Sequence, residues 1–185
     1  MPRQRLLTLL EIAMMAAIAL VFSNIKLFEM PQGGSVSLVM VPIALIAVRR
    51  GIAAGLLTGA IVGVLQLFMG SYIVHPVQLL LDYPLAFAAL GLSGVISISH
   101  MEKKSRRVLA IWSSLLIGVL VRFACHFASG VIWFGEFAPE GMPVAWYSFL
   151  YNITYLIPEM LIAGIVLTMV LASAPQLLLV RNRLA

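Results

Sequence analysis

The sequence predicts an all-α integral membrane protein, a six-helix bundle with both termini in the cytoplasm. Of its 185 residues, 62% are hydrophobic and only 10% are charged, whereas soluble domains carry about a quarter charged residues. The apolar runs are continuous and about 20 residues long, which fits membrane helices and not the ten-residue alternating strands of a barrel. The basic residues cluster between these runs. We therefore expect residues 1–185 to form a single transmembrane domain.

Hydropathy places the six spans at residues 6–25, 36–48, 53–69, 76–98, 108–130 and 144–171. The second is too short to cross about 30 Å of hydrocarbon as a straight helix. It should either borrow residues from the 32–37 loop or pack as a partial span.

The basic residues determine the orientation. Of the 12 Lys and Arg residues, all but Lys26 and Arg122 lie before span one, between spans two and three, between spans four and five, or after span six. Cytoplasmic loops of membrane proteins are enriched in Lys and Arg. Both termini are therefore predicted to be cytoplasmic, and the net charge of +5 reports orientation instead of nucleic-acid binding.

Small residues recur at four-residue intervals in two spans. Span three carries Gly51, Gly55, Gly59 and Gly63, and span one carries Ala13 and Ala17. Such stripes let another helix approach closely. The glycines fit packing inside the bundle or against a partner. The alanines fit internal packing and docking onto a separate membrane subunit equally well.

Span five carries a polar face of Arg122, His126, Ser129 and Trp133. At about 100° per residue, these spacings place all four side chains on one side of a helix. A cation inside a membrane costs roughly 2.5–3.5 kcal/mol on insertion scales, so such a face rarely points at lipid. We expect it to line a pocket for a small molecule.

Two other spans place polar groups at a similar depth. Asp82 lies six residues into span four, about 9 Å below its outer end at 1.5 Å per residue, and His126 lies at a comparable level. The first turns of span six carry Tyr147 and Asn152. Two alternatives stay open: Asp82 could form an internal ion pair with Arg122, and the aromatic residues could form an interfacial belt.

A carboxylate, an imidazole, an amide and aromatic faces suit a flat, nitrogen-rich ligand, including a cationic one. The outer loop at Gln32, Gly33 and Gly34 is flexible enough to act as a lid. We predict no metal, cofactor or catalytic residue. No nucleotide-binding G-x-x-x-x-G-K-[ST] motif occurs in the sequence, so a partner would have to drive uptake. Glu159, deep in span six after a proline, has no assigned role.

Several short motifs together resemble one family. They are Pro31-Gln-Gly-Gly-Ser-Val-Ser37, Arg49-Arg-Gly51, His75-Pro-Val-Gln-Leu-Leu-Leu-Asp-Tyr83, Arg122 with His126, Phe137-Ala-Pro-Glu-Gly141 and Tyr147-Ser-Phe-Leu-Tyr-Asn152. These motifs resemble the thiamine-specific substrate-binding (S) components of energy-coupling factor (ECF) transporters, the ThiT/YuaJ family, along nearly the whole chain.

The resemblance implies a multi-pass protein of a prokaryotic cell membrane that binds thiamine near the outer face, without enzymatic activity. It also implies a transmembrane coupling (T) subunit, contacted by Ala13 and Ala17, and two cytoplasmic ATPases. Its implied thiamine contacts are Asp82, Tyr83, His126, the stacking Trp133, Tyr147 and Asn152, with Arg122 near the hydroxyethyl end. Some members cover the ligand with a tryptophan of the first outer loop, which this chain lacks.

Three rival functions are compatible with the same residues. The ligand could be a related vitamin or the pyrimidine half of thiamine. The chain could be an intramembrane hydrolase using His126 with Asp82 or Glu159, although Ser129 is a poor nucleophile candidate. It could also be a proton-coupled carrier acting through Asp82 and Glu159.

Overall fold

The computed structural model describes residues 3–179 as a bundle of six helical segments. Five of the segments hold a single helix: α1 (Arg3–Ser23), α2 (Met40–Arg50), α3 (Ile52–Gln66), α6 (Lys104–Trp133) and α7 (Val144–Ser173). The fourth segment is a run of short pieces, α4 (Pro76–Leu80), η1 (Leu81–Leu85), α5 (Ala86–Ala89) and η2 (Leu90–Gly94). The all-α prediction is confirmed, and each expected span corresponds to one segment.

The remaining elements are short. Strands β1 (Phe28–Glu29) and β2 (Ser35–Val36) form an antiparallel hairpin between α1 and α2. Single 3₁₀ turns, η3 (Gly135–Phe137) and η4 (Pro175–Leu177), precede and follow α7. The basic residues Arg181 and Arg183 lie outside the described residues.

Four helical segments of the described chain are long and apolar enough to cross a membrane: α1, residues 76–94, α6 and α7. Helices α6 and α7 have 30 residues each, which gives about 45 Å at 1.5 Å per residue. Both therefore exceed the roughly 30 Å hydrocarbon core and extend beyond it.

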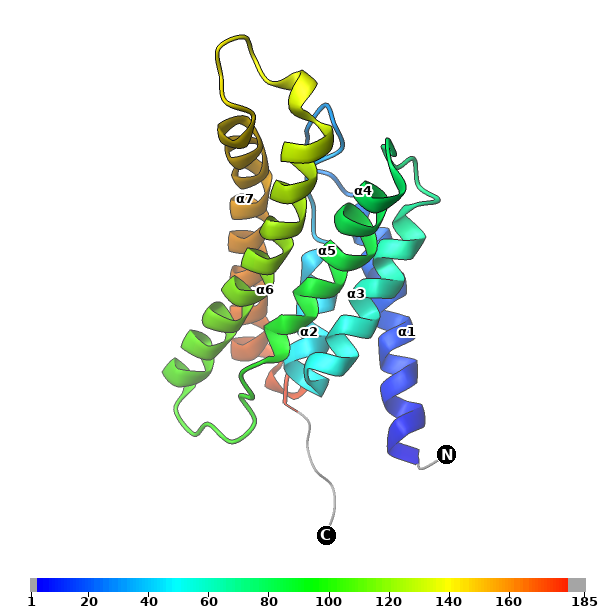
Figure 1. Cartoon of the computed structure of the whole chain (residues 1–185). Coiled ribbons are helices and arrows are strands. Elements are labelled where there is room, and N and C mark those ends of the chain that lie inside the picture. Colours follow the sequence, from blue (N-terminus) through cyan, green and yellow to red (C-terminus); the bar gives the residue numbers. More distant parts are fainter. Residues whose placement is uncertain (1–2, 180–185) are drawn as a thin grey trace.

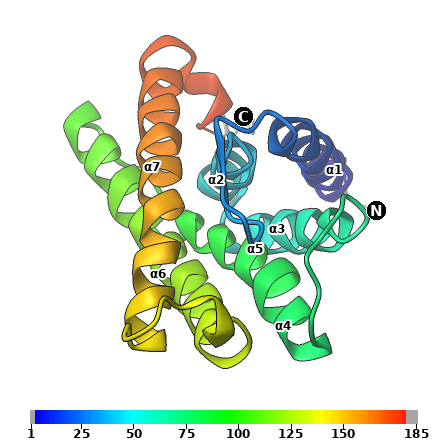
Figure 2. The ribbon, with the colours of Figure 1, turned by 90° about the horizontal axis from the view of Figure 1, so that it is seen from above.

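The two ends of the bundle carry different elements (Figure 1). The start of α1 and the turn η4 lie at one end, and the β1–β2 hairpin and η3 lie at the other. Seen from above, the hairpin segment runs from the top of α1 to a position over α2 and α5 (Figure 2). This arrangement agrees with an even number of crossings and with the predicted outer position of the 32–34 loop.

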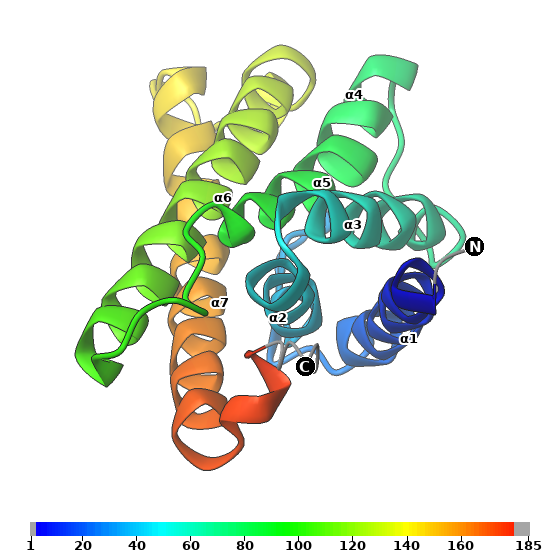
Figure 3. The same cartoon turned by 90° about the horizontal axis from the view of Figure 1, so that it is seen from below.

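Helix α2 lies at the centre of the half of the bundle that holds the start of α1 and the turn η4 (Figure 3). It lies between α1, α3 and α7 in the view from below (Figure 3), and Met40, Ile43, Ala44 and Ile46 are fully buried. The helix has only 11 residues, so the second span is a partial one. It does not extend into the 32–37 loop as helix, because residues 35–36 pair as a strand instead.

The glycines of α3 pack against the fourth segment. A Cβ atom at Gly59 would lie 2.1 Å from the carbonyl oxygen of Phe87, and one at Gly63 would lie 2.5 Å from that of Tyr83. Only a hydrogen side chain allows this backbone contact. The glycine stripe therefore serves packing within the bundle, and it fixes the height of residues 83–87 beside α3.

Helix α1 buries one face and leaves another open. Ile12, Ala16 and Ala19 are buried, whereas Ala13 and Ala17 are exposed. The alanine stripe predicted from the sequence thus does not pack inside the described chain, and its alternative role as a docking surface stays available.

Candidate functional site

A cavity of about 640 Å³ lies at the end of the bundle that carries the β1–β2 hairpin and η3 (Figure 1), within the size range of small-molecule sites. Its walls come from the hairpin, the end of α3, the fourth segment, α6 and α7. Nine of the predicted ligand and lid residues line it: Gln32, Gly33, Gly34, Asp82, Tyr83, Arg122, His126, Tyr147 and Asn152. Residues distant in sequence therefore meet at the depth that the spans predicted.

A π-helical turn presents two adjacent residues to this cavity. Pro84 lacks a backbone N–H and so cannot donate to a preceding carbonyl, and the chain widens locally, with Ala86 N–H donating to the carbonyl of Leu81. Single π turns of this kind are frequent at functional sites. Asp82 and Tyr83 both lie in the turn and both line the cavity.

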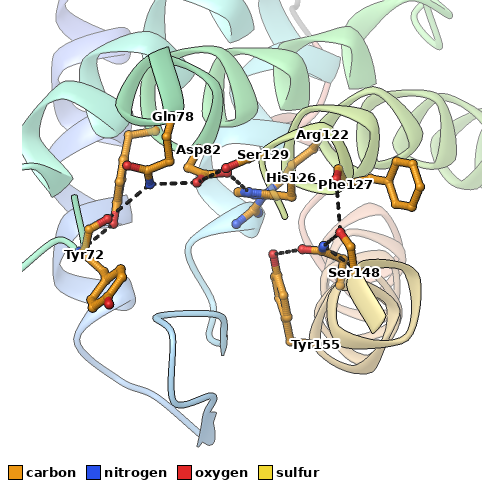
Figure 4. A network of polar contacts seen from close by, with 11 residues as sticks. Tyr72, Gln78, Asp82, Arg122, His126, Phe127, Ser129, Ser148 and Tyr155 are labelled. Carbon is orange, nitrogen blue, oxygen red and sulfur yellow. Dashed lines mark hydrogen bonds and ion pairs between the residues drawn. The ribbon is translucent and has the colours of Figure 1, made fainter. Parts of the chain in front are cut away.

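The carboxylate of Asp82 is the centre of the polar network (Figure 4). Its Oδ2 accepts hydrogen bonds from Ser129 Oγ at 2.6 Å and from Gln78 Nε2 at 2.8 Å, and its Oδ1 lies 3.0 Å from His126 Nδ1. A carboxylate offers about four acceptor sites. These three bonds hold the group in place and leave acceptor capacity on Oδ1 for a ligand.

Gln78 connects Asp82 to the loop before α4. The side chain is buried; its Nε2 also donates to the carbonyl of Tyr72 at 3.1 Å, and its Oε1 accepts from Val74 N–H at 3.1 Å. Tyr83 supports the same loop, because its hydroxyl accepts from Tyr72 N–H at 3.0 Å. The outer loop of residues 70–75 and the acidic residue are thus positioned together.

His126 lies between the guanidinium of Arg122 and the carboxylate of Asp82. Its Nε2 is 3.3 Å from Arg122 Nε, and since a guanidinium can only donate, Nε2 is the acceptor. The proton of the neutral ring is then on Nδ1 and points to Asp82 Oδ1. Both ring nitrogens are engaged within the protein, so the imidazole offers a ligand its edge and face.

Arg122 forms its ion pair with Glu159 and not with Asp82. Its Nη1 lies 3.0 Å from Glu159 Oε2, with both side chains almost fully buried, and its guanidinium carbon lies 4.7 Å above the ring centre of Phe87. The Asp82–Arg122 pair that the sequence left open is therefore absent, because α7 supplies a closer carboxylate. Asp82 remains without a cationic partner.

Trp133 lies outside the lining of the cavity, and the structure departs here from the sequence prediction. Its ring stacks on His75, with ring centres 5.2 Å apart, and the next residue, Phe134, lines the cavity instead. Helix α6 ends at Trp133, and Phe134 has the non-helical φ and ψ values of −116° and 17°. Trp133, the last residue of α6, therefore stacks on His75, and the first residue past the helix takes the place at the cavity that the helical spacing assigned to Trp133.

Helix α7 contributes an aromatic wall. Tyr147, Tyr151 and Tyr155 follow one another at four-residue intervals and all line the cavity. Asn152 stands beside them: its Oδ1 accepts from Tyr155 Oη at 2.8 Å, and its Nδ2 donates to the Ser148 carbonyl at 2.8 Å. The second Nδ2 hydrogen has only a 3.4 Å contact with Ser148 Oγ, a long distance for a hydrogen bond.

The hairpin segment lies against this wall of α7. Gln32 N–H donates to Tyr151 Oη at 3.1 Å, and Ser37 Oγ donates to Glu159 Oε1 at 3.1 Å. Between them, Gly34 lies so close to the Tyr155 ring that a Cβ atom there would approach it to 2.7 Å. The predicted lid residues thus cover the cavity through contacts with α7, with Gly33 at a φ of 98° that favours glycine.

The charged lining groups leave a net negative charge. Lys26 and Arg122 stand against the carboxylates of Glu29, Asp82 and Glu159, which gives −1 with His126 neutral. Within residues 3–179, His, Cys, Asp and Glu side chains do not gather in threes that could hold a metal ion. The site can therefore hold a flat cation by one free carboxylate and aromatic faces.

Several residues that line the cavity were not among the predicted ligand contacts, and Gln78, Glu159 and Phe134 are three of them. Gln78 shares the helical face of Asp82, so its spacing could have identified it. Glu159 was noticeable only as an intramembrane acid, and its partner across the helices was not predictable from spacing. Phe134 had no sequence pattern that separated it from its neighbour Trp133.

Comparison with known proteins gives consistent matches. Residues 9–179 match the family described as Thiamine transporter protein (Thia_YuaJ). The chain is 44% identical over 183 residues to Thiamine transporter ThiT of Bacillus subtilis (strain 168), covering 95% of each chain. It is 29% identical over 188 residues to Thiamine transporter ThiT of Lacticaseibacillus paracasei, covering 97% of this chain and 94% of that one.

A solved structure shares the fold. The structure of ThiT from Listeria monocytogenes matches with a TM-score of 0.88 at 32% sequence identity, and the match covers 96% of this chain and 100% of that chain.

The contact between Tyr151 and the hairpin generates a test of the lid. In Tyr151→Phe, the hydrogen bond to Gln32 N–H is lost, at a cost of about 0.5–1.5 kcal/mol. We expect faster hydrogen–deuterium exchange of residues 28–36 in the ligand-free protein, measured by mass spectrometry. Tyr147→Phe is the matched control, since no hydrogen bond of Tyr147 Oη occurs in the described structure. Equal exchange of residues 28–36 in both variants would contradict a role of the Tyr151–Gln32 hydrogen bond in holding the hairpin.

Proposed function

Because the chain belongs to the family of thiamine transporter proteins (Thia_YuaJ), we propose that its outer cavity is the thiamine site and that it serves as the substrate-binding subunit of an ATP-driven importer of the ECF type. The protein is a multi-pass membrane protein of a transport family and not an enzyme. The observation that carries the proposal is the carboxylate of Asp82, held by three hydrogen bonds in an aromatic-lined cavity and lacking a cationic partner.

Each part of thiamine has a matching group in the cavity. The amino group of its pyrimidine can donate to Asp82 Oδ1, and a pyrimidine nitrogen can accept from the second Nδ2 hydrogen of Asn152. The thiazolium cation is favoured by the net negative lining and by aromatic faces, which Phe134 and Tyr147 supply. Tyr83 stands beside Asp82 as a further hydroxyl contact.

Arg122 takes a different role from the one implied by the family resemblance. Its Nε and Nη1 are engaged by His126 and Glu159, so we propose that it supports the site through these residues and does not contact the hydroxyethyl end. The same ion pair argues against a proton-coupled carrier, because both carboxylate oxygens of Glu159 already accept hydrogen bonds, from Arg122 and Ser37. A hydrolase is unsupported as well, since the Ser129 hydroxyl donates to Asp82.

Transport requires an energy source that the sequence does not contain. We propose that α1 docks on a coupling (T) subunit through Ala13 and Ala17, which are exposed and small enough for close helix contact, and that two cytoplasmic ATPases drive the complex. The positive-inside distribution of Lys and Arg supports a cavity on the outer side, and we propose that the complex lies in a prokaryotic cell membrane.

Removal of the Asp82 charge should weaken thiamine binding. In Asp82→Asn we expect the dissociation constant to rise at least tenfold, about 1.4 kcal/mol, measured by calorimetric titration of the purified protein. Glu140→Gln, which changes an exposed carboxylate outside the lining of the cavity, should stay within about threefold of wild type. Unchanged binding in Asp82→Asn would contradict the assigned site. Wild-type protein that binds the pyrimidine alone as tightly as thiamine would favour a precursor transporter.

Two adjacent aromatic residues provide a second test. Phe134→Ala should lose about tenfold in thiamine affinity, because it removes an aromatic face from the cavity. Trp133→Ala, which removes a ring stacked on His75 outside the lining, should stay within about threefold. The same titration measures the thiamine affinity of both variants. A larger loss of affinity in Trp133→Ala than in Phe134→Ala would show that Trp133 is the stacking residue.

The docking surface can be separated from the binding site. The double variant Ala13→Leu, Ala17→Leu should bind thiamine like wild type in detergent, yet reduce cellular uptake of labelled thiamine about tenfold or more, since bulk at a close helix contact is costly. Ala53→Leu adds the same bulk at an exposed site on α3 and should leave uptake unchanged. Normal uptake in the double variant would exclude this docking face.

A further inference from the structure

Glu159 is an acid deep in the bundle that the assigned thiamine contacts do not use. Its side chain is 1% exposed, and its two carboxylate oxygens have different partners. Oε2 accepts from Arg122 Nη1 on α6 at 3.0 Å, and Oε1 accepts from Ser37 Oγ in the connection between β2 and α2 at 3.1 Å. A buried carboxylate with this degree of pairing is held in one place. Its position therefore determines where the guanidinium of Arg122 lies.

Only one imidazole ring separates this guanidinium from Asp82. Arg122 Nε is 3.3 Å from one nitrogen of His126, and Asp82 Oδ1 is 3.0 Å from the other. Asp82 is the carboxylate on the side of the His126 ring opposite Arg122. Apart from Glu159 itself, the other carboxylate of the cavity lining is Glu29, which is already paired with Lys26. A buried cation that loses its partner is strongly unfavourable, so Arg122 without Glu159 would be drawn to Asp82.

We propose that Glu159 is a positioning residue that reserves Asp82 for the ligand by holding Arg122 on the other side of His126. This inference rests on the proposed function, in which Asp82 binds thiamine. The pair of Arg122 and Glu159 is neutral as a unit, so the single uncompensated charge of the inner cavity is that of Asp82. Arg122, held by Glu159, also keeps its Nε–H on His126, which keeps the Nδ1 proton of that ring on Asp82.

The same arrangement explains why an arginine lies beside a site for a cation. Alone, Arg122 would repel a thiazolium and neutralise its anionic contact. When it is paired with Glu159, its positive charge is balanced, and it acts as a hydrogen-bond donor that orients His126. Loss of Glu159 therefore converts a supporting residue into a competitor of the ligand, an effect distinct from loss of fold stability.

The test is a rescue experiment with thiamine titration of purified protein. In Glu159→Gln, which keeps the shape and removes the charge, we expect the dissociation constant to rise at least tenfold. Adding Arg122→Gln removes the competing cation, and the double variant should bind thiamine at least about threefold more tightly than Glu159→Gln, because neutral replacement of a buried pair is well tolerated. It should stay weaker than wild type, since the Nε–H that orients His126 is lost as well. A purely structural role of Glu159 would not predict recovery of affinity on loss of a second polar partner.

Glu159→Asp gives a second measurement in a variant that keeps the buried charge. Its side chain is shorter by one methylene, so the carboxylate lies farther from Arg122. We expect the dissociation constant to rise about threefold, which is less than in Glu159→Gln. Thermal unfolding of each variant separates stability from affinity. The inference is overturned if both single variants bind thiamine like wild type, or if the double variant binds no better than Glu159→Gln. Wild-type protein without thiamine affinity would instead refute the proposed function from which the inference starts.

Discussion

An ionised group inside a membrane bundle is costly unless it is paired, and the pairing of Arg122 with Glu159 organises the site around Asp82, the one carboxylate left for a ligand. Arg122 on α6 and Glu159 on α7 satisfy each other, and their pair joins the two longest helices below the cavity. Lipid offers no hydrogen bonds, so the cost of an unpaired charge there is large. The positions of His126 and Asp82 follow from this pair, since each is hydrogen-bonded to the next residue in the chain of contacts.

The backbone makes this chain of contacts possible at two places. The close contact of α3 with the fourth segment, allowed by Gly59 and Gly63, fixes the height of the segment that carries Asp82. The π-helical turn around Pro84 then directs Asp82 and Tyr83 together into the cavity. The hairpin completes the enclosure through the tyrosines of α7, so the lid and the polar floor rest on the same helix.

Helical spacing was a good guide where the helices are regular. The face of Arg122, His126 and Ser129 is present as predicted, and the shared depth of Asp82, His126 and Asn152 brought them to one cavity. Spacing failed where regularity ends. Phe134 follows the last residue of α6 and lines the cavity, whereas Trp133, which shared the predicted face, stacks on His75. The angle of a side chain about a helix axis is local information, but it loses meaning at the helix end.

The sequence by itself determined the class of protein, its six helical segments and the family, and it predicts the orientation. These follow from composition, from the length of apolar runs, from the distribution of basic residues and from motifs, all of which are properties of consecutive residues. Only the tertiary structure decided which acid pairs with Arg122, since the sequence suggested only Asp82 and the partner is Glu159 on α7. Pairing depends on distances across the bundle, and these are set by how the helices pack, which no single stretch of sequence contains.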